Sequence, residues 1–269
     1  MKKAANIFAT LIRDLKVEEL FDERFPIFKI YYLSTHKLYL HFITIDDGIE
    51  RLPILYFQKM SLQYMKQNKN LVHLWEDQLL YNLQSVQDRF QSLIQNNDTI
   101  YARSCRIQRI DKNLYDVFID QHHLMNSAKS KFKYGMYFQN ELLSVMGVSA
   151  GRWMTKEGNK RKSFEIIRFA TKANFTVVGG FTKFLKFISE ELGVDEWMTY
   201  QDLDWAIKGI YQKNNFEYKN ISQPHVNYIH KVSLKRYTQI QWESLNAEQQ
   251  LDFYKVYNAG SMKLIKRYE

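Results

Sequence analysis

Cysteine, proline and glycine are all scarce in this chain of 269 residues. Because Cys105 is the single cysteine, an intrachain disulfide and a cysteine-based zinc site are both excluded, and we expect a buried strand residue there. Three prolines and ten glycines leave little material for a long flexible linker. Since 45% of the residues are hydrophobic and 15% are aromatic, the composition indicates a packed globular protein rather than a disordered one.

Long apolar runs are also missing. No window of the sequence approaches the length of a membrane-spanning helix. The chain starts with Met1, Lys2 and Lys3, but Asp14 and the acids that follow come too soon for the apolar core of a secretory signal. We therefore expect a cytoplasmic protein without a membrane partner.

Acidic residues are outnumbered: 29 Asp and Glu stand against 38 Lys and Arg, which gives a formal net charge of +9. A positive balance favours polyanionic partners such as nucleic acid or nucleotide cofactors. Many basic proteins bind no nucleic acid, so the charge permits a nucleic-acid partner without requiring one.

Up to about residue 98 the pattern predicts a smaller α/β region. Apolar positions at helical spacing predict a helix over residues 5–21, and two strands are expected between residues 28 and 45. The remaining elements expected here are a helix at 56–66, a strand at 71–74 and a helix at 78–94. Asn96-Asn97-Asp98 ends the last helix and divides the chain into predicted domains at residues 1–98 and 99–269.

The second half alternates strands and helices, which predicts a mixed α/β (α+β) domain with a central mixed sheet flanked by helices. One helix is expected to be capped by Asp111 and to bury Leu114, Val117 and Phe118. A basic loop is expected from Arg152 to Lys162. The other elements expected are strands at 104–109, 133–138, 142–148, 164–171, 196–200 and from 216, and helices at 182–192 and 205–214.

A glycine-rich turn, Val177-Val178-Gly179-Gly180, leads from a strand directly into the helix at 182–192. Glycine lets the backbone approach a ligand closely, and the free amides at a helix start form a site for phosphate. Lys183 adds a positive charge. The turn suits the pyrophosphate of a coenzyme, although the two glycines also fit a tight strand-to-helix turn without a ligand.

The segment Ile210-Tyr211-Gln212-Lys213-Asn214-Asn215-Phe216-Glu217 resembles a signature of the GNAT N-acyltransferases, in which a helix ends in Leu-Tyr-x-Lys-x-Gly-Phe. The order of elements from Ser104 to Tyr228 is similar to that family as well. The resemblance implies that Tyr211 protonates the departing thiolate of coenzyme A. It also implies that the glycine turn holds the pyrophosphate and that the strand at 164–169 pairs with the pantetheine arm. The residues that it assigns to acetyl-CoA are Ile167, Phe169, Val178, Gly179, Gly180, Phe181, Thr182 and Lys183.

Two features depart from the GNAT pattern. The family's loop reads Gln/Arg-x-x-Gly-x-Gly/Ala, and neither Gly179 nor Gly180 has Gln or Arg three residues earlier. Asn215 stands where the family has glycine, although asparagine can also adopt the left-handed conformation.

A narrower resemblance covers most of the chain after about residue 70. It is to the C-terminal GNAT-like module of phage homing-type endonucleases, which follows a nuclease domain of the very-short-patch-repair kind. The segments that carry it are Ile100–Ile107, His123-Leu124, Val177–Gly180, His230–Lys235 and Val256–Gly260, preceded by Leu71–Asp77, which resembles the end of that nuclease domain.

The first half does not show the carboxylates of a metal-dependent nuclease. Such enzymes hold Mg²⁺ with two or more carboxylates on adjacent strand ends. The strands expected between residues 28 and 45 have no acid in their interiors. The acids nearby are Asp46, Asp47, Glu50, Glu76 and Asp77. We interpret this half as a degenerate remnant or a structural support.

Three further sets of residues have both a functional and a structural interpretation. Glu165 and Asp202 are candidate general bases, or salt-bridged surface acids. His122 and His123 end a helix, but a metal site needs a third ligand that we cannot locate, so we predict no metal. The basic loop with Trp153 could follow a nucleic-acid backbone or simply be solvated.

Two hypotheses remain open. The first is a GNAT-like N-acyltransferase that uses acetyl-CoA or another acyl-CoA, with an unknown amine acceptor, Tyr211 as the acid, and Glu165 or Asp202 as the base. The second is a non-catalytic GNAT-like module with a DNA-associated role and a degenerate nuclease-like first half.

Overall fold

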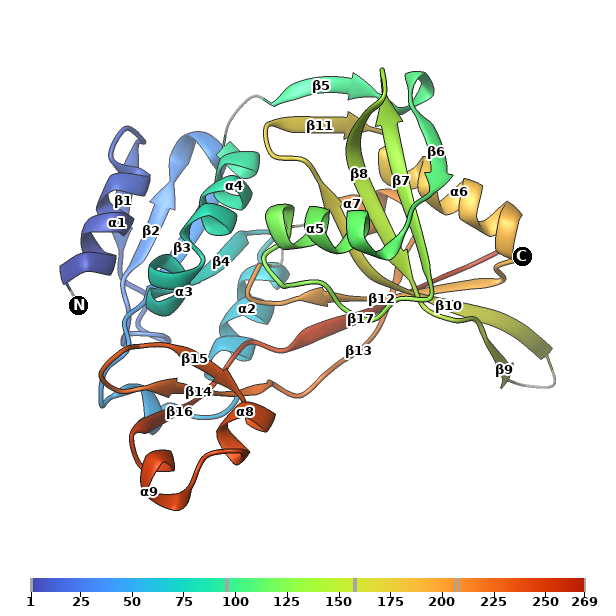
Figure 1. Cartoon of the computed structure of the whole chain (residues 1–269). Helices are drawn as coiled ribbons and strands as arrows, with labels where there is room; N and C mark the ends of the chain where they lie inside the picture. Colours follow the sequence, from blue (N-terminus) through green and yellow to red (C-terminus); the bar gives the residue numbers. More distant parts are fainter. Residues whose placement is uncertain (1, 95–96, 157–158, 206, 208, 269) are drawn as a thin grey trace. The chain divides into compact units, whose positions relative to one another are not determined.

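The computed structural model describes residues 2–94, 97–156, 159–205, 207 and 209–268 (Figure 1). Several residues of predicted elements lie outside these ranges: Asn96, Glu157, Gly158, Ala206 and Lys208. Within the described ranges, no helix has both the length and the apolar character needed to cross a membrane.

Contacts between residues group the chain into two compact units. The first comprises Met1–Leu83, Gln201–Lys208 and Ile221–Met262, and the second comprises Gln84–Tyr200, Gly209–Asn220 and Lys263–Glu269. This grouping differs from a single division after residue 98, because two later segments return to the first unit.

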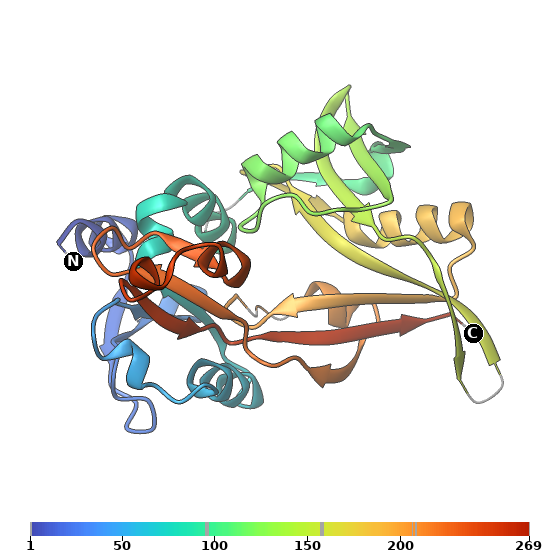
Figure 2. The same cartoon turned by 60° about the horizontal axis from the view of Figure 1, so that its bottom comes forward.

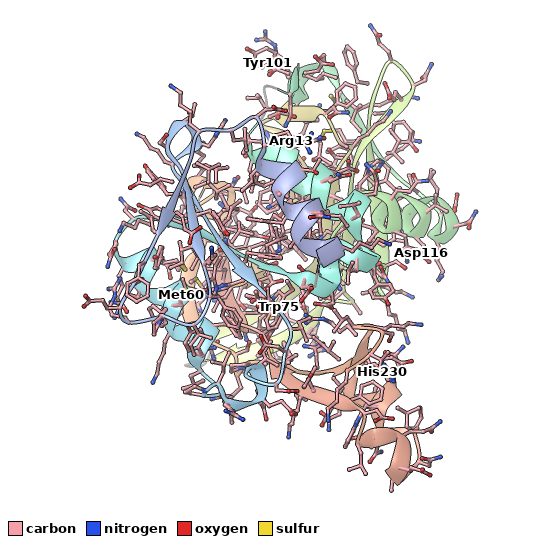
Figure 3. The ribbon with its side chains drawn as sticks, turned by 90° about the vertical axis from the view of Figure 1, so that its left-hand side faces the viewer. Arg13, Met60, Trp75, Tyr101, Asp116 and His230 are labelled. Atoms are coloured by element: carbon pink, nitrogen blue, oxygen red, sulfur yellow. The ribbon has the colours of Figure 1, made fainter. Side chains whose placement is uncertain are left out.

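The first unit contains a four-stranded sheet with the order β1-β2-β3-β4. Neighbouring strands are antiparallel except β3 and β4, which are parallel and are joined through helix α2. The bounds are β1 Val17–Leu20, β2 Ile30–Leu33, β3 Leu38–Ile43, α2 Tyr56–Lys66 and β4 Asn70–Trp75, with 3₁₀ turns at Ser34–His36 and Ile49–Arg51. Met60 and Trp75, labelled in Figure 3, are fully buried in this unit.

Two predicted helices are shorter or broken. The segment expected as one helix at 5–21 contributes only its first part to helix α1, Lys2–Ile12. Its last part forms the edge strand β1 instead. The helix expected at 78–94 is interrupted at Asn82, which separates α3, Glu76–Tyr81, from α4, Leu83–Ile94.

A second, three-stranded sheet completes the first unit, with the order β15-β14-β16. The bounds are β14 Val226–His230, β15 Arg236–Thr238, α8 Gln239–Glu243, α9 Ala247–Gln250 and β16 Phe253–Tyr257. The side chains of Thr238 and Asn246 form capping boxes that start the two short helices. Tyr228 of the sheet stacks on Trp242 of α8 with ring centroids 4.0 Å apart.

Two fully buried histidines are joined in the interior of the first unit. The Ser61 hydroxyl donates to the Leu203 carbonyl (2.9 Å), so its oxygen accepts from Nε2 of His73 (2.8 Å). Nδ1 of neutral His73 is then the acceptor for Nδ1–H of His41, at 2.8 Å. Burial lowers the pKa of His73 to about 3 and the pKa of His41 well below its usual value.

Acidic residues tie the returning segments to the first unit. One carboxylate oxygen of the buried Asp204 accepts from Trp75 Nε1 (3.1 Å), and the other accepts from the Ala259 amide (2.8 Å). Asp77 accepts two hydrogen bonds from the Arg236 guanidinium, at 2.7 and 2.9 Å. These bonds between residues far apart in sequence explain why the segments at 201–208 and 221–262 belong to this unit.

The second unit is built on the large mixed sheet with the order β13-β17-β12-β10-β8-β7-β6, to which β9 adds beside β10. Strands β10 and β12 are parallel, whereas β10-β8, β8-β7 and β7-β6 are antiparallel. The bounds are β6 Arg106–Arg109, β7 Phe132–Phe138, β8 Glu141–Val148, β9 Arg152–Lys156, β10 Asn159–Thr171, β12 Glu196–Asp202, β13 Glu217–Ile221 and β17 Ser261–Arg267. The predicted fold class, a mixed α+β protein with a central mixed sheet, is confirmed.

Two helices cover opposite faces of this sheet. On one face, Tyr134 and Phe169 contact Phe187 and Phe184 of helix α6, Gly180–Leu192. On the other face, Val145 and Ala170 form a buried cluster with helix α5, Lys112–His122. The alternation of side chains along paired strands accounts for this separation.

The predicted cap of α5 is confirmed, but its buried face is not the one expected. Asp111 accepts from the third amide of the helix at 2.9 Å. Leu114 and Val117 are 38% and 47% exposed, whereas Tyr115 and Ile119 are fully buried beside Phe118. The helix is rotated because two apolar stripes overlap in its sequence, and the one with the large tyrosine fills the space above β8.

Two other expectations for the second unit were wrong. The stretch expected as a basic loop is the hairpin of β9 and the start of β10. The helix expected at 205–214 is reduced to α7, Ile210–Lys213, because Trp205 is buried in the first unit and Gly209 has φ +145°. A small parallel pair joins β5, Asp98–Tyr101, to β11, Phe175–Val178, with a 3₁₀ turn at Ala102–Ser104.

Candidate active site

A notch opens in the large sheet where β10 and β12 separate. Their parallel register runs from Ser163 to Ile166, whereas the pairing of β10 with β8 continues to Thr171. A register shift with β8 follows Ile166, and the Thr199 hydroxyl of β12 donates to the Ile166 carbonyl at 3.2 Å. The backbone of β10 beyond this point, which includes the predicted residues Ile167 and Phe169, therefore forms the edge of the notch.

The glycine turn starts helix α6 and is open to solvent. Gly179 is exposed with φ +78°, a conformation that favours glycine, and Val178 is 46% exposed. The first helical hydrogen bond runs from the Lys183 amide to the Gly179 carbonyl (2.9 Å), so the three preceding amides have no partner in the helical ladder. Gly180 is buried, and a Cβ there would lie 3.1 Å from Val177 Cγ1, so packing also requires this glycine.

The charge of Lys183 is used inside the fold. Its ammonium group donates to the carbonyl oxygens of Ala102 (2.9 Å) and Cys105, and so fixes the turn after β5. Thr182, also predicted at the pyrophosphate, donates its hydroxyl hydrogen to Asn214 Oδ1 at 2.7 Å. Lys183 therefore orients β5 beside the glycine turn, and its hydrogen bonds leave it poorly placed to hold a phosphate.

The exposed Arg103 is a cation near this turn that the sequence reasoning did not single out. It follows Ala102, whose Cβ lies 3.8 Å from the position that a Cβ on Gly179 would take. The guanidinium lies 5.1 Å from the ring of Tyr101, which is paired with Val178. The pairing of β5 with β11 and the hydrogen bonds of Lys183 to Ala102 and Cys105 bring Arg103 here, and residues 98–101 showed no strong strand pattern.

Tyr211 lies on the α6 side of the notch. Its ring contacts Phe181 and Phe216 edge-on, with centroids 5.6 and 5.5 Å apart. Phe181 also contacts Phe169 of β10, at 5.1 Å. Burial raises the pKa of Tyr211, while hydrogen bonding with Thr199 and the charge of Arg89 oppose the rise. The phenol is therefore protonated at neutral pH and available as a proton donor.

The opposite face of the notch presents Glu165. Phe164 lies on the α6 face with Trp197, so the next side chain along the strand points to the α5 face. Burial raises the pKa of Glu165, and the charges of Arg152, Lys263 and Arg168 oppose the rise. A carboxylate with a raised pKa is a stronger base than one in water.

Two more side chains share the α5 face. Arg168 is paired with Gly147 beneath α5 and donates to the Asn126 carbonyl at 3.3 Å. His123 follows α5, and burial lowers its pKa to about 4, with a further contribution from the Arg168 charge. Neutral His123 accepts from the Met125 amide at 3.0 Å. His122 contacts Phe118 edge-on at 4.7 Å, so its ring packs against the helix.

Asp202, the other predicted base, belongs to the first unit. Its carboxylate accepts from the Asp204 amide at 2.9 Å, which organises the turn after β12. Of the predicted catalytic residues, the second unit therefore contains Tyr211 and Glu165.

The acids considered for a nuclease site all serve the fold of the first unit. Glu76 accepts from the Ile45 amide (2.8 Å), Asp46 from the Gly48 amide (2.8 Å) and Asp47 from the Tyr254 hydroxyl (2.8 Å). Glu50 accepts from the Lys255 amide, and Asp77 is paired with Arg236. Among the described residues, no group of three or more His, Cys, Asp and Glu side chains could hold a metal ion.

Comparison with known proteins gives only distant likenesses. No family model matches the chain, and no curated protein matches its sequence. Among solved structures, the chain is similar to the IAA acetyltransferase from Bacillus cereus, with 12% identity, 61% of this chain and 100% of that chain covered, and a TM-score of 0.32.

Two further solved structures are similar to the same extent. A GNAT family acetyltransferase from Elizabethkingia anophelis with acetyl-CoA bound has 12% identity, covers 61% of this chain and 99% of its own, and has a TM-score of 0.33. The ribosomal-protein-S18-alanine N-acetyltransferase from Escherichia coli has 9% identity, covers 61% and 93%, and has a TM-score of 0.34. At TM-scores this low, the likenesses assign no function to the chain.

Proposed function

We propose that the second unit is an N-acyltransferase that moves an acyl group from acetyl-CoA, or another acyl-CoA, to an amine in the cytoplasm. The observation that carries the proposal is the notch between β10 and β12, which has an open helix start and the phenol of Tyr211 on one face and Glu165 on the other. The acyl-CoA donor and the amine acceptor would therefore approach the same notch from opposite faces of the sheet.

The turn of α6 suits the pyrophosphate of coenzyme A. The free amides of Gly180, Phe181 and Thr182 and the positive end of a helix dipole favour an anion beside Gly179. Arg103 supplies an exposed positive charge near the turn, whereas the charge of Lys183 is held by its hydrogen bonds inside the fold. The edge of β10 beyond Ile166, where the pairing with β12 ends, offers the backbone groups of Phe169 to the pantetheine arm, whereas the Ile167 carbonyl already accepts from the Arg168 guanidinium at 2.8 Å.

Each candidate residue has one chemical role. Acetyl-CoA would supply the acyl group as a thioester. Glu165 accepts a proton from the amine as its nitrogen forms a bond to the acyl carbon. Tyr211 donates its phenolic proton to the sulfur as the carbon–sulfur bond breaks. The raised pKa of Glu165 strengthens it as a base, and the raised pKa of Tyr211 keeps the phenol protonated before the transfer.

The test is turnover with acetyl-CoA and a panel of primary amines, including amino acids, polyamines and a lysine peptide, followed by the release of free thiol. Tyr211→Phe should lower kcat by about 10²-fold or more and leave KM for acetyl-CoA unchanged, since positioned acids contribute that much to catalysis. Tyr218→Phe, at a tyrosine that is 55% exposed on β13, is the matched control and should leave kcat unchanged. Equal rates for wild type and Tyr211→Phe would exclude the proposed acid.

A second candidate function follows from the resemblance to phage homing-type endonucleases: a non-catalytic module that associates with DNA. The engagement of Glu76, Asp77 and the other first-unit acids in backbone and side-chain hydrogen bonds supports a loss of nuclease activity. This candidate predicts an intact DNA duplex after incubation with the chain and Mg²⁺, as judged by electrophoresis. Cleavage that depends on Mg²⁺ would contradict it.

A further inference from the structure

The hairpin of β9 and β10 extends beyond the sheet as a two-stranded ribbon (Figure 2). Residues 159–162 of β10 pair with β9, and the pairing of β10 with β12 begins only at Ser163. The described side chains of the ribbon are exposed or half-buried, with Trp153 65% and Met154 53% exposed. Such a projecting ribbon contributes little to the core of the second unit.

Positive charge lies on both faces of this ribbon. The pairing of Lys160 with Thr155 and of Lys162 with Trp153 puts these four side chains on one face. The pairing of Arg161 with Met154 and of Ser163 with Arg152 puts those four on the other. Among the side chains that the structure describes, each face therefore has two cations.

Two of these cations are free to meet an external partner, one on each face. Lys162 is anchored, because its ammonium donates to the Leu192 carbonyl at 2.7 Å. Arg152 lies at the base of the ribbon, where its charge acts on Glu165. Lys160 and Arg161 form no hydrogen bond or ion pair with the described part of the chain. Burying these two charges against an uncharged partner would cost free energy, so an anionic partner is favoured.

We propose that the β9–β10 ribbon is a DNA-binding element that inserts between the two sugar-phosphate walls of the major groove. The groove of B-form DNA is about 12 Å wide and admits a two-stranded ribbon. Lys160 meets the phosphates of one wall and Arg161 those of the other, because their side chains point in opposite directions. The net charge of +9 favours the same partner at long range. This inference does not depend on acyl transfer.

An anionic membrane surface fits the ribbon less well. Insertion at a membrane interface needs a continuous apolar face. Trp153 and Met154 are neighbours in the strand and point to opposite faces, so each apolar side chain is surrounded by cations. Duplex RNA is also disfavoured, since its major groove is too deep and narrow for side chains to read.

The experiment measures the binding of the full chain to a labelled DNA duplex of mixed sequence by fluorescence anisotropy, from about 50 to 200 mM salt. Lys160→Ala and Arg161→Ala should each reduce the slope of log K against log salt by about 0.9, and together by about 1.8, one released counterion per lost phosphate contact. The matched control is Lys186→Ala with Lys219→Ala, which removes the same charge from exposed positions on α6 and β13.

The two single variants show whether one face of the ribbon or both faces contact phosphates. Equal loss of slope in both single variants, with an unchanged control, supports insertion between the two walls. Loss in only one of them would overturn that arrangement, because only one face would then meet phosphate. Equal effects of the control pair, absence of DNA binding at low salt, or tighter binding to anionic lipid vesicles or to duplex RNA would overturn the proposal itself.

Discussion

Acid should unfold the first unit through its buried histidine pair. His41 and His73 are neutral in the folded state because burial lowers both pKa values, to about 3 for His73. In the unfolded chain both titrate near their usual value of 6.5. The contribution of the two neutral histidines to the free energy of unfolding is therefore fully present above pH 6.5 and is lost as the pH falls from there toward 3.

The magnitude follows from proton linkage. Each histidine that stays neutral in the folded state costs about 1.4 kcal/mol of unfolding free energy per pH unit below its unfolded pKa. At about pH 5 this amounts to roughly 2 kcal/mol for each ring, or roughly 4 kcal/mol for the pair. Burial raises the pKa of Asp204, which acts in the opposite sense over the same range and offsets part of this loss.

A substitution isolates the histidine contribution from that of Asp204. His41→Gln keeps a donor for His73 Nδ1 but removes one titrating group, so the slope of unfolding free energy against pH should fall by about 1.4 kcal/mol per unit. The control is His225→Gln, at an exposed histidine of the same unit, which should leave the slope unchanged.

Urea unfolding between about pH 6.5 and 5 measures the slope, with near-ultraviolet circular dichroism as the signal for the aromatic-rich core. The same slope in wild type and His41→Gln would refute the assignment of neutral, buried rings.

Three further substitutions test how the fold is held together, each by urea unfolding at neutral pH. Asp111→Ala should cost about 1 kcal/mol, because the first turn of α5 loses its side-chain cap; no loss would show that the cap is not formed in solution. Asp77→Ala should cost roughly 3 kcal/mol, because it leaves the Arg236 charge without its partner, and a loss under about 1 kcal/mol would contradict the buried pair. Gly147→Ala should cost about 1–3 kcal/mol, because the added Cβ would overlap the buried Tyr115 hydroxyl; an unchanged midpoint would contradict that close packing.

The sequence predicted β6, β7, β8, β10, β12 and β13 of the large sheet because these strands carry local signals, but it did not predict β9 or β17. Residues 132–148 form a hairpin whose turn has positive φ at Gln139 and Asn140, and the sequence predicted both of its strands, at 133–138 and 142–148. The helix that follows the glycine turn was also found from its apolar period. These features depend on residues that are neighbours in the chain, so the pattern within one segment is enough to predict them.

Other features depend on contacts that no local pattern shows. The ribbon was mistaken for a loop because polar and charged residues lie on both of its faces, so the alternation of a half-buried strand is missing. The return of residues 221–262 to the first unit rests on bonds such as Trp75 to Asp204 and Asp77 to Arg236. For the site, the sequence indicated Tyr211, but it could not show that Lys183 is held by backbone carbonyls.

Binding of acetyl-CoA to the intact chain tests the central claim most directly. In a thermal-shift assay, a hundredfold excess over Kd should raise the unfolding free energy by about 2.7 kcal/mol. Val178→Glu should abolish the shift, because it puts a carboxylate beside the free amides of α6, whereas Val232→Glu, the same change at a valine that is 88% exposed in the first unit, should leave the shift intact. No shift of the wild type at millimolar acetyl-CoA, or an equal shift in Val178→Glu, would contradict the assignment of this turn to an acyl-CoA.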